Sequence, residues 1–561
     1  MSDGLHYEIF FKKHAKASWS LVEAMPDREK AIGMAKSLLK QNAQASVRVN
    51  KERFNEEHRT YRTIAIFEEG AEKMGDVKEK TGAADLPCMA PDDLAKPLAR
   101  DTIHRALTHW LERRETTVME LLHRPDLAET LESTDTDLQH AVQKIAIASA
   151  KDSEASVHAY VKQINELIKQ TLTRLYQDDR AKRLPRPGGK AKLEEVVEAA
   201  GAASGYRMRA ALAARLRKAG SYGKKLNALV ELAEETLPEE SADLAAKEEI
   251  DNFLAGVLGF PAGIAALLGE TRDLGETVDR LVSLYEGDPA ELMAAPVAAS
   301  AMADRLKQGE LGQCRTVICR TLLAELEKPR RLRPDCIHKE LEFSRMLAQK
   351  LVMTASPDLP ADLLIEIFTS RSARLLQPET IDELQRKSGD IDGQVGALIS
   401  LTENLVGDQN RMKLAGYIRS LLGSHGAESQ YVRGPGPALG RLSALAGHQR
   451  KILASEFEAE DKTDLARLFD AIGLKLIDES KILNAIEGGG QPVLDRAAGL
   501  MRLATAGAMP KGDCTADAQA RALRLLRSPK GAEEARSPEA KPKLQDIQTM
   551  LASLSQQASA A

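Results

Sequence analysis

The sequence has few aromatic residues and few cysteines. Phe, Trp and Tyr together make up 4% of its 561 residues. β-Sandwiches and barrels draw on aromatic and β-branched residues to fill their faces, so this composition favours helices. An odd and sparse set of cysteines supplies no disulfide framework and is typical of a reducing compartment. The five are Cys88, Cys314, Cys319, Cys336 and Cys514.

Long apolar runs are also missing. The most apolar stretch, residues 253–268, is broken at Gly259-Phe260-Pro261 and is shorter than the ~20 residues that span a bilayer. We interpret it as a buried helical hairpin. The first four residues do not begin a basic-then-apolar targeting signal. We therefore expect a cytoplasmic protein without a membrane span.

Motifs that carry chemistry are absent as well. The sequence contains no phosphate-binding G-x-x-x-x-G-K-[ST], no strand-led G-x-G-x-x-G and no G-x-S-x-G nucleophile elbow. Cys314, Cys319 and the Cys336-x-His338 pair match no familiar zinc spacing. We expect no metal and no cofactor, and the sequence leans away from an enzyme. A site assembled from residues distant in sequence is left open.

Amphipathic helical segments are what the sequence has in abundance. Hydrophobic residues make up 43% and charged residues 29%, with a net charge of −5, so the chain is globular and long enough for several packing units. Residues 361–423 show the pattern most clearly, with stripes such as Leu364 and Phe368 and short breaks between helices. Asp408 is expected to cap one helix, and Gly423 to end it with positive φ.

The first 70 residues differ from the rest. Strands are expected at Leu5–Phe11 and Ser18–Ala24, then a helix after Pro26-Asp27, then two strands around residues 47–49 and 64–66. This ββαββ order predicts a four-stranded, mostly antiparallel sheet covered by one helix. The free edge or face of such a sheet is typical of a site that binds a peptide or another domain.

The predicted fold is mainly α, an irregular helical array that is solenoid-like or built of stacked bundles, preceded by this small α+β module. No fixed period of 20 to 50 residues is present, so no named repeat is assigned. The predicted divisions are the ββαββ module 1–70, a linker 71–96, an N-terminal helical unit 97–180, a basic Pro/Gly break 181–192, a middle array 193–360, a C-terminal array 361–527, a flexible linker 528–543 and an amphipathic helix 544–557.

Three sets of residues are candidate binding sites. The last helix has an apolar stripe, and an isolated helix of its length is marginal in water, so it either enters a partner's groove or folds back on its own array. Arginines beside the helices of residues 361–423 suit an anion, and the basic stretch 180–225 suits nucleic acid. The sets are Leu544, Ile547, Leu551 and Leu554 for a partner; Arg371, Arg374, Arg419 and His425 for an anion; and Arg183, Arg186, Arg207, Arg215 and Lys218 for nucleic acid.

The sequence favours a non-catalytic cytosolic scaffold or adaptor, because helical arrays offer extended surfaces to protein partners. Two alternatives from other classes are kept. One is a regulator that binds an anionic small molecule or a nucleotide on the C-terminal array. The other is a nucleic-acid binder, which is the less favoured partner because a scattered basic patch gives only non-specific affinity.

Overall fold

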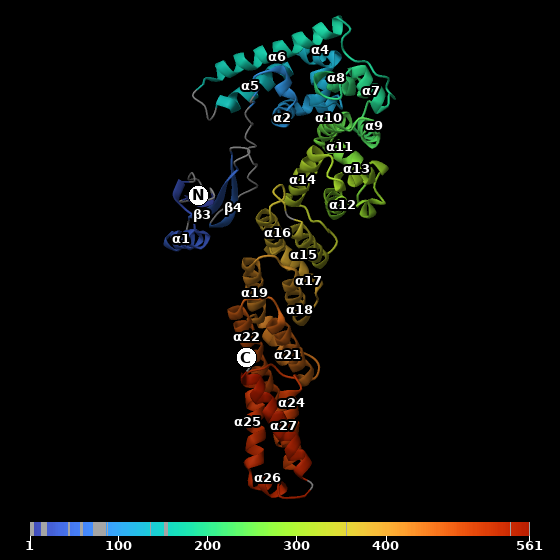
Figure 1. Ribbon diagram of the computed structural model, residues 1–561. Helices are drawn as coiled ribbons and strands as arrows, with labels where there is room; N and C mark the ends of the chain where they lie inside the picture. The colour runs from blue at the N-terminus through green and yellow to red at the C-terminus, as the bar shows by residue number, and fades with distance from the viewer. Residues whose placement is uncertain are drawn as a thin grey trace. The chain divides into compact units, whose positions relative to one another are not determined.

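The computed structural model divides the chain into two compact units, Met1–Gly82 and Ala83–Ala561 (Figure 1). It describes residues 5–12, 20–42, 45–55, 60–70, 86, 88–134, 136–150, 155–354, 356–538 and 540–559. Each unit is described by itself below. The fold class predicted from the sequence, mainly α with a small α+β module at the front, is confirmed.

The first unit is a four-stranded antiparallel sheet with one helix packed on it. Its elements are β1 (Leu5–Lys12), β2 (Ser20–Met25), α1 (Arg28–Gln41), β3 (Ser46–Asn55) and β4 (Thr60–Gly70). The strand order is β2-β1-β3-β4, and every neighbouring pair is antiparallel. Ile9, Val47 and Val49 lie on the face of the sheet that α1 covers. They form the core with Ala31 and Ala35 of α1. Period-2 alternation in the strands and the spacing of the alanines in α1 produce this packing.

Helices make up the second unit. Its first part contains η1 (Pro91–Ala95), α2 (Pro97–Arg113), α3 (Val118–His123), α4 (Pro125–Ser133), α5 (Thr136–Ala150), α6 (Val157–Arg180), α7 (Leu193–Ala200), α8 (Gly205–Leu216), α9 (Tyr222–Glu234), α10 (Glu240–Leu258), α11 (Pro261–Leu268), α12 (Leu274–Glu286), η2 (Pro289–Leu292), α13 (Val297–Lys307) and α14 (Gly312–Glu327).

The second part continues in the same manner. It contains α15 (Ile337–Met353), α16 (Ala361–Leu375), α17 (Pro378–Lys387), α18 (Ile391–Leu401), η3 (Thr402–Asn404), α19 (Asp408–Leu422), α20 (His425–Arg433), α21 (Ala438–Ala454), α22 (Ala459–Ser480), α23 (Ile482–Glu487), α24 (Val493–Thr505), α25 (Asp513–Arg527), α26 (Pro529–Glu534) and α27 (Ala540–Ser559).

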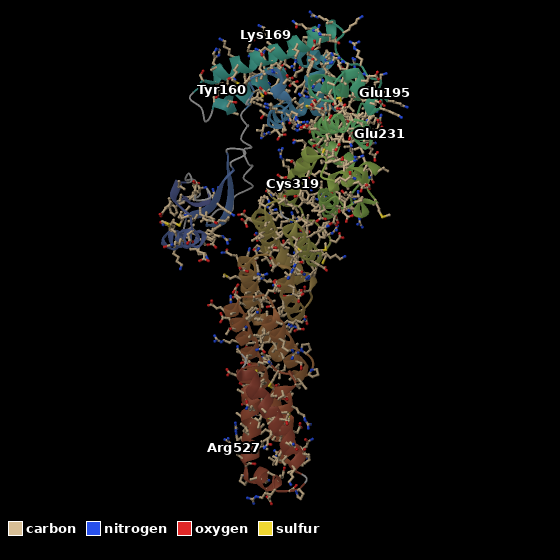
Figure 2. The ribbon with its side chains drawn as sticks, viewed as in Figure 1. Tyr160, Lys169, Glu195, Glu231, Cys319 and Arg527 are labelled. Atoms are coloured by element: carbon tan, nitrogen blue, oxygen red, sulfur yellow. The ribbon has the colours of Figure 1, made fainter. Side chains whose placement is uncertain are left out.

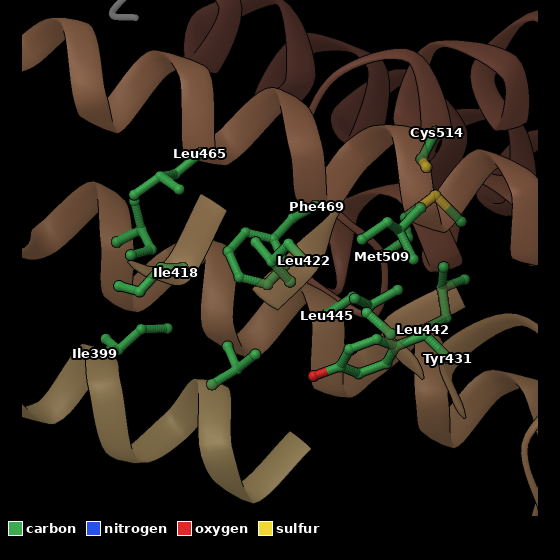
Figure 3. Close-up of a cluster of buried hydrophobic side chains, with 14 of the residues drawn as sticks. Ile399, Ile418, Leu422, Tyr431, Leu442, Leu445, Leu465, Phe469, Met509 and Cys514 are labelled. Atoms are coloured by element: carbon green, nitrogen blue, oxygen red, sulfur yellow. The ribbon is translucent and has the colours of Figure 1, made fainter. Parts of the chain in front are cut away.

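Contacts in this unit join helices that are close in chain order, such as α12 with α14, α21 with α22 and α24 with α25. This is the pattern of an array, in which each segment is buried by its neighbours. From α15 to α27 the buried side chains form one continuous core that includes Leu422, Tyr431 and Phe469 (Figure 3). Short connections between amphipathic helices produce it.

Two joints of the array are built alike. Asp251 on α10 accepts hydrogen bonds from the backbone N–H groups of Gln313 and Cys314, at 2.7 and 2.9 Å, at the start of α14. Asp470 on α22 accepts from Asp513 and Cys514, at 2.6 and 3.0 Å, at the start of α25. In both joints the cysteine thiol donates to the main-chain carbonyl of the same aspartate. Each carboxylate therefore caps the positive end of a helix that begins far along the chain.

Glycine is required at the second joint. Gly512 has a φ of 134°, and a Cβ there would lie 2.2 Å from Oδ2 of Asp470. Any side chain would push the carboxylate off the helix end.

One helix boundary differs from its prediction. α19 has Gly407 as its N-cap, with a φ of 97°, and Asp408 is its first residue rather than its cap. A Cβ at Gly407 would lie 2.8 Å from the side chain of Thr369, so the chain enters this helix through a turn that only glycine fits. Gly423 ends the helix with a φ of −77°, which corrects the expectation of positive φ.

The predicted apolar hairpin and the three predicted breaks between helical regions can be compared with the structure. Residues 253–268 form α10 and α11, which bend by 104° at their break; Phe253 and Leu267 are fully buried. No single helix in the described ranges is long and apolar enough to cross a bilayer. Residues 181–192 join α6 to α7 without a helix, whereas the predicted linkers 71–96 and 528–543 contain η1 and α26 respectively. Residues 71–85 lie outside the described part of the chain.

Candidate functional site

Four of the five residues that were considered for nucleic-acid binding make polar contacts within the chain. Arg183 and Arg186 pair with Asp178 and Asp179 of α6, with closest distances of 2.6 and 2.9 Å. Two further arginines donate to main-chain carbonyls: Arg207 to Ala200 at 2.7 Å and Arg215, which is buried, to Ala191 at 3.0 Å. The stem of Lys218 lies beside Gly189. These contacts hold the 181–192 connection on the array, and nucleic-acid binding through this set stays a prediction.

The four residues considered for an anion site have different surroundings. Arg371 is 4% exposed and donates to the carbonyls of Leu326, Lys328 and Arg330 and to Glu340 Oε1, at 2.7 to 3.1 Å. Burial lowers the pKa of Arg371, and the neighbouring Glu340 carboxylate raises it. The arginine therefore completes the C-terminal end of α14 and the turn after it.

The other three residues of that set face elsewhere. Arg374 donates to the carbonyl of Glu327 at 3.1 Å, on the surface beside Arg371. Arg419 pairs with Asp461 of α22 at 2.9 Å, and His425 is exposed at the start of α20. The three arginines therefore contact different parts of the array, and anion binding by this set stays a prediction.

The predicted stripe of the last helix lies on the array itself. Ile547 of α27 is 1% exposed within the continuous core, and Leu551 packs against the same core. Lys543 and Asp546 form ion pairs with Asp495 and Arg502 of α24, at 2.5 and 3.4 Å. Leu544 is half-buried, and the side chain of Leu554 lies outside the described part. The arrangement is the one in which the helix folds back on its own chain; partner binding by the stripe stays a prediction.

A polar cluster joins three helices in a way that the sequence did not reveal. His448 Nε2 of α21 lies 2.8 Å from Asp392 Oδ1 of α18, and the hydroxyl of Tyr431 of α20 donates to the same oxygen at 2.9 Å. The hydrogen bond from His448 lowers the pKa of Asp392. The residues are 39 and 56 positions apart, so no local spacing predicts them. The cluster ties the helices together beside the core shown in Figure 3.

An exposed apolar loop is a candidate surface for binding a protein partner. Residues 293–297, Met-Ala-Ala-Pro-Val, connect η2 to α13 and are called the apolar loop below. Met293 is 89% exposed and Val297 86%, whereas Leu292 before the loop is fully buried and Ala298 after it is 7% exposed. Five consecutive apolar residues between Pro289 and the start of α13 were the signal that sequence reasoning missed.

A buried histidine in the first helices gives a pH dependence. His123 of α3 is 4% exposed, and its Nδ1 donates to the carbonyl of Met119 at 2.7 Å. The pKa of His123 is lowered to about 3, mainly by burial and also by the nearby Arg209 and Arg174, while the hydrogen bond to Met119 acts in the opposite direction. Below pH ~6.5 His123 binds a proton in the unfolded chain but stays neutral in the folded chain. The free energy of unfolding therefore falls by about 1.4 kcal/mol per pH unit down to about pH 3. Above pH ~6.5 the imidazole is neutral in both the folded and the unfolded chain, so this loss of stability is absent.

We expect His123→Gln to flatten that slope. As the pH falls from about 6.5 to about 5, the free energy of unfolding of the wild type should fall by roughly 2 kcal/mol relative to that of the variant. Chemical denaturation at each pH measures both values. His109→Gln is the matched control, because the His109 side chain is 96% exposed. A parallel pH profile for wild type and His123→Gln would contradict the buried, neutral state of this imidazole.

Among the residues that the structure describes, no group of three His, Cys, Asp or Glu side chains is placed to hold a metal ion. No protein-family model, curated protein or solved structure matches the chain.

Proposed function

We propose that this protein is a non-catalytic scaffold or adaptor, and that the apolar loop is one of its docking surfaces for a protein partner. The exposure of Met293 and Val297 at the two ends of the loop carries the proposal. Single exposed apolar side chains are common on protein surfaces, whereas a group of neighbouring ones favours an interaction surface. In this loop Met293, Ala294 and Val297 are exposed, and Ala295 and Pro296 between them are half-buried. Methionine suits such a surface because its unbranched side chain adapts to different partners.

The loop is also held in place before any partner arrives. Leu292 and Ala298 anchor its two ends in the core, and Pro296 restricts its backbone. Pro296 packs against Gly269, where a Cβ would approach its ring to 2.9 Å. A loop that is already ordered loses little conformational entropy on binding, so a small apolar contact contributes more of its gross energy to affinity.

The first unit supplies a second exposed apolar element. β2 is an edge strand, in which Leu21 is 53% and Val22 41% exposed. Ile9 pairs with Glu23 and Phe10 with Leu21, which leaves Val22 as the extra residue of a bulge. Bulges protect a strand edge from backbone pairing, so the side chains rather than the main chain are the contact offered here. Two weak contacts on one chain gain from avidity.

The test replaces the two ends of the apolar loop by charge. Met293→Asp combined with Val297→Asp should reduce recovery of a direct partner from extracts of the source cells by about tenfold or more, since aspartate removes apolar contact and must be desolvated. The melting temperature should stay within about a degree of wild type, because both side chains already face water. Quantitative mass spectrometry after affinity purification gives the recovery.

Met353→Asp is the matched control, because Met353 is 88% exposed, nearly as much as Met293, but belongs to α15 and not to the loop. It should leave recovery unchanged. The proposal fails if every protein enriched by wild type is enriched equally by the loop variant. It also fails if Met353→Asp causes the same loss, since the effect then reflects added charge rather than the loop.

A further inference from the structure

The first helices of the array enclose a cavity that the docking function does not use. It lies among α2, α3, α4, α5 and α6, and its volume is about 100 Å³. Tyr160 and Lys169, labelled in Figure 2, mark the course of α6, whose inner face closes one side of the cavity. Ile164 and Leu167 are on that inner face, whereas Lys169 is exposed.

The cavity wall is almost wholly aliphatic. Among the described residues that line it, Glu132 and Thr171 are the only ones with polar side chains, and none is aromatic. The apolar lining residues are Leu86, Leu94, Ile103, Ala106, Leu107, Leu121, Leu122, Ala128, Leu131, Leu138, Ala141, Val142, Ile145, Ile164, Leu167, Ile168, Leu172 and Leu175. An apolar cavity of ~150 Å³ excludes water and takes up a small apolar molecule, so a cavity of this size and lining suits an aliphatic group.

Two small clusters of buried side chains border the cavity, and the half-buried Leu86 packs against both of them. Leu94, Ala99 and Leu167 belong to one small cluster of buried side chains, and Val142 and Ile145 to another. From α15 onward, in contrast, the core is continuous. A cavity left inside a helical unit destabilises it in proportion to the cavity volume, so a bound chain that filled the cavity would stabilise this part of the array.

The two polar groups of the wall define the head group that fits. The Thr171 hydroxyl donates to the carbonyl of Leu167 in its own helix, at 2.8 Å, and the Tyr176 hydroxyl donates to Oε2 of Glu132. Glu132 is exposed at the rim of the cavity, where its carboxylate can accept a further hydrogen bond, whereas both hydroxyls already donate within the chain. A ligand carboxylate would meet a carboxylate without a donor, whereas a ligand hydroxyl could donate to Glu132.

We propose that this cavity binds a single aliphatic chain that ends in a hydroxyl group, with the chain among α2, α5 and α6 and the hydroxyl at Glu132. Acyclic long-chain alcohols and isoprenoid alcohols share this chemistry. The site is separate from the apolar loop, so the two proposals stand or fall independently.

The test compares two probes of equal chain length on the full chain. By isothermal titration, 1-octanol should bind, and octanoate should bind about tenfold more weakly, because its negative charge would lie beside that of Glu132. Glu132→Gln removes the like charge and should bring octanoate to within a few-fold of octanol. Bound octanol should also raise the melting temperature, which is the opposite of the general effect of an alcohol on a protein without a site.

Filling the cavity from the wall should abolish binding. Ala141→Leu on α5 places an isobutyl group in the space, so octanol binding should be lost while the melting temperature of the free protein stays level or rises. Gln143→Leu is the matched control, because Gln143 is exposed on the same helix and should leave binding unchanged. Ala106→Leu on α2 fills the cavity from the opposite wall and replaces Ala141→Leu if that variant fails to fold.

The proposal is overturned if wild type does not bind octanol, or if a folded filling variant binds it as tightly as wild type. Equal binding of octanol and octanoate by wild type would overturn the assignment of the hydroxyl head group to Glu132.

Discussion

Replacing Arg371 by methionine is expected to lower the free energy of unfolding of the helical unit by about 3–5 kcal/mol, the cost of breaking a buried ion pair from one side. The change leaves Glu340, which is 1% exposed, without its guanidinium partner. It also removes the donors from the carbonyls of Leu326, Lys328 and Arg330. Chemical denaturation should show the loss as a lower midpoint, and hydrogen exchange should speed up at the end of α14.

Arg374→Met is the matched control for this prediction. Arg374 lies on the same helix and makes one hydrogen bond, at 3.1 Å, on the surface, so its removal should cost less than about 1 kcal/mol. Combining Arg371→Met with Glu340→Leu should recover part of the loss, because no isolated charge then stays buried. If Arg371→Met and Arg374→Met have equally small effects, Arg371 is not a structural tie, and a role in binding an anion gains support.

Truncating Ile547 to alanine should destabilise the C-terminal end of the array by about 2–5 kcal/mol, the range for removing a large aliphatic side chain from a core. Ile547 is 1% exposed and is the residue of α27 that enters the continuous core. Thermal unfolding should therefore begin earlier in the variant. Deleting residues 540–561 should have an effect at least as large, since the α24 face beneath α27 then becomes exposed to water.

Gln548→Ala provides the comparison, because Gln548 is exposed on the next position of the same helix and should change stability by less than about 0.5 kcal/mol. Unchanged melting of both Ile547→Ala and the deletion would show that α27 is not part of the fold in solution. The stripe would then be available to a partner's groove.

Local pattern predicted the elements better than their connections. The alternation Val47-x-Val49 and the spacing of Ala31 and Ala35 are set by residues near in sequence, so the sheet and its helix were predictable. The N-cap of α19 was predicted one residue too late, at Asp408, because the turn at Gly407 depends on Thr369, which is distant in sequence. Rules for helix ends that use only the neighbouring residues have no access to such a contact.

Candidate sites fared differently for a related reason. The arginines Arg183, Arg215 and Arg371 look alike as charges in a sequence, but their roles depend on carbonyls and carboxylates 5 to 45 positions away. The cavity is likewise formed by residues from five helices, none of which is unusual by itself. The apolar loop is the exception, since five adjacent apolar residues are visible in the sequence without any structure.

The paired joints at Asp251 and Asp470 bear on how such a chain grows. The two joints share their atoms, but the aspartate and the cysteine are 63 residues apart in one and 44 in the other. The same joint therefore occurs twice with different lengths of chain between its two parts. Duplication of a segment followed by gain or loss of a helix would produce this arrangement. The unequal separations also explain why these two similar joints do not appear as a fixed period in the sequence.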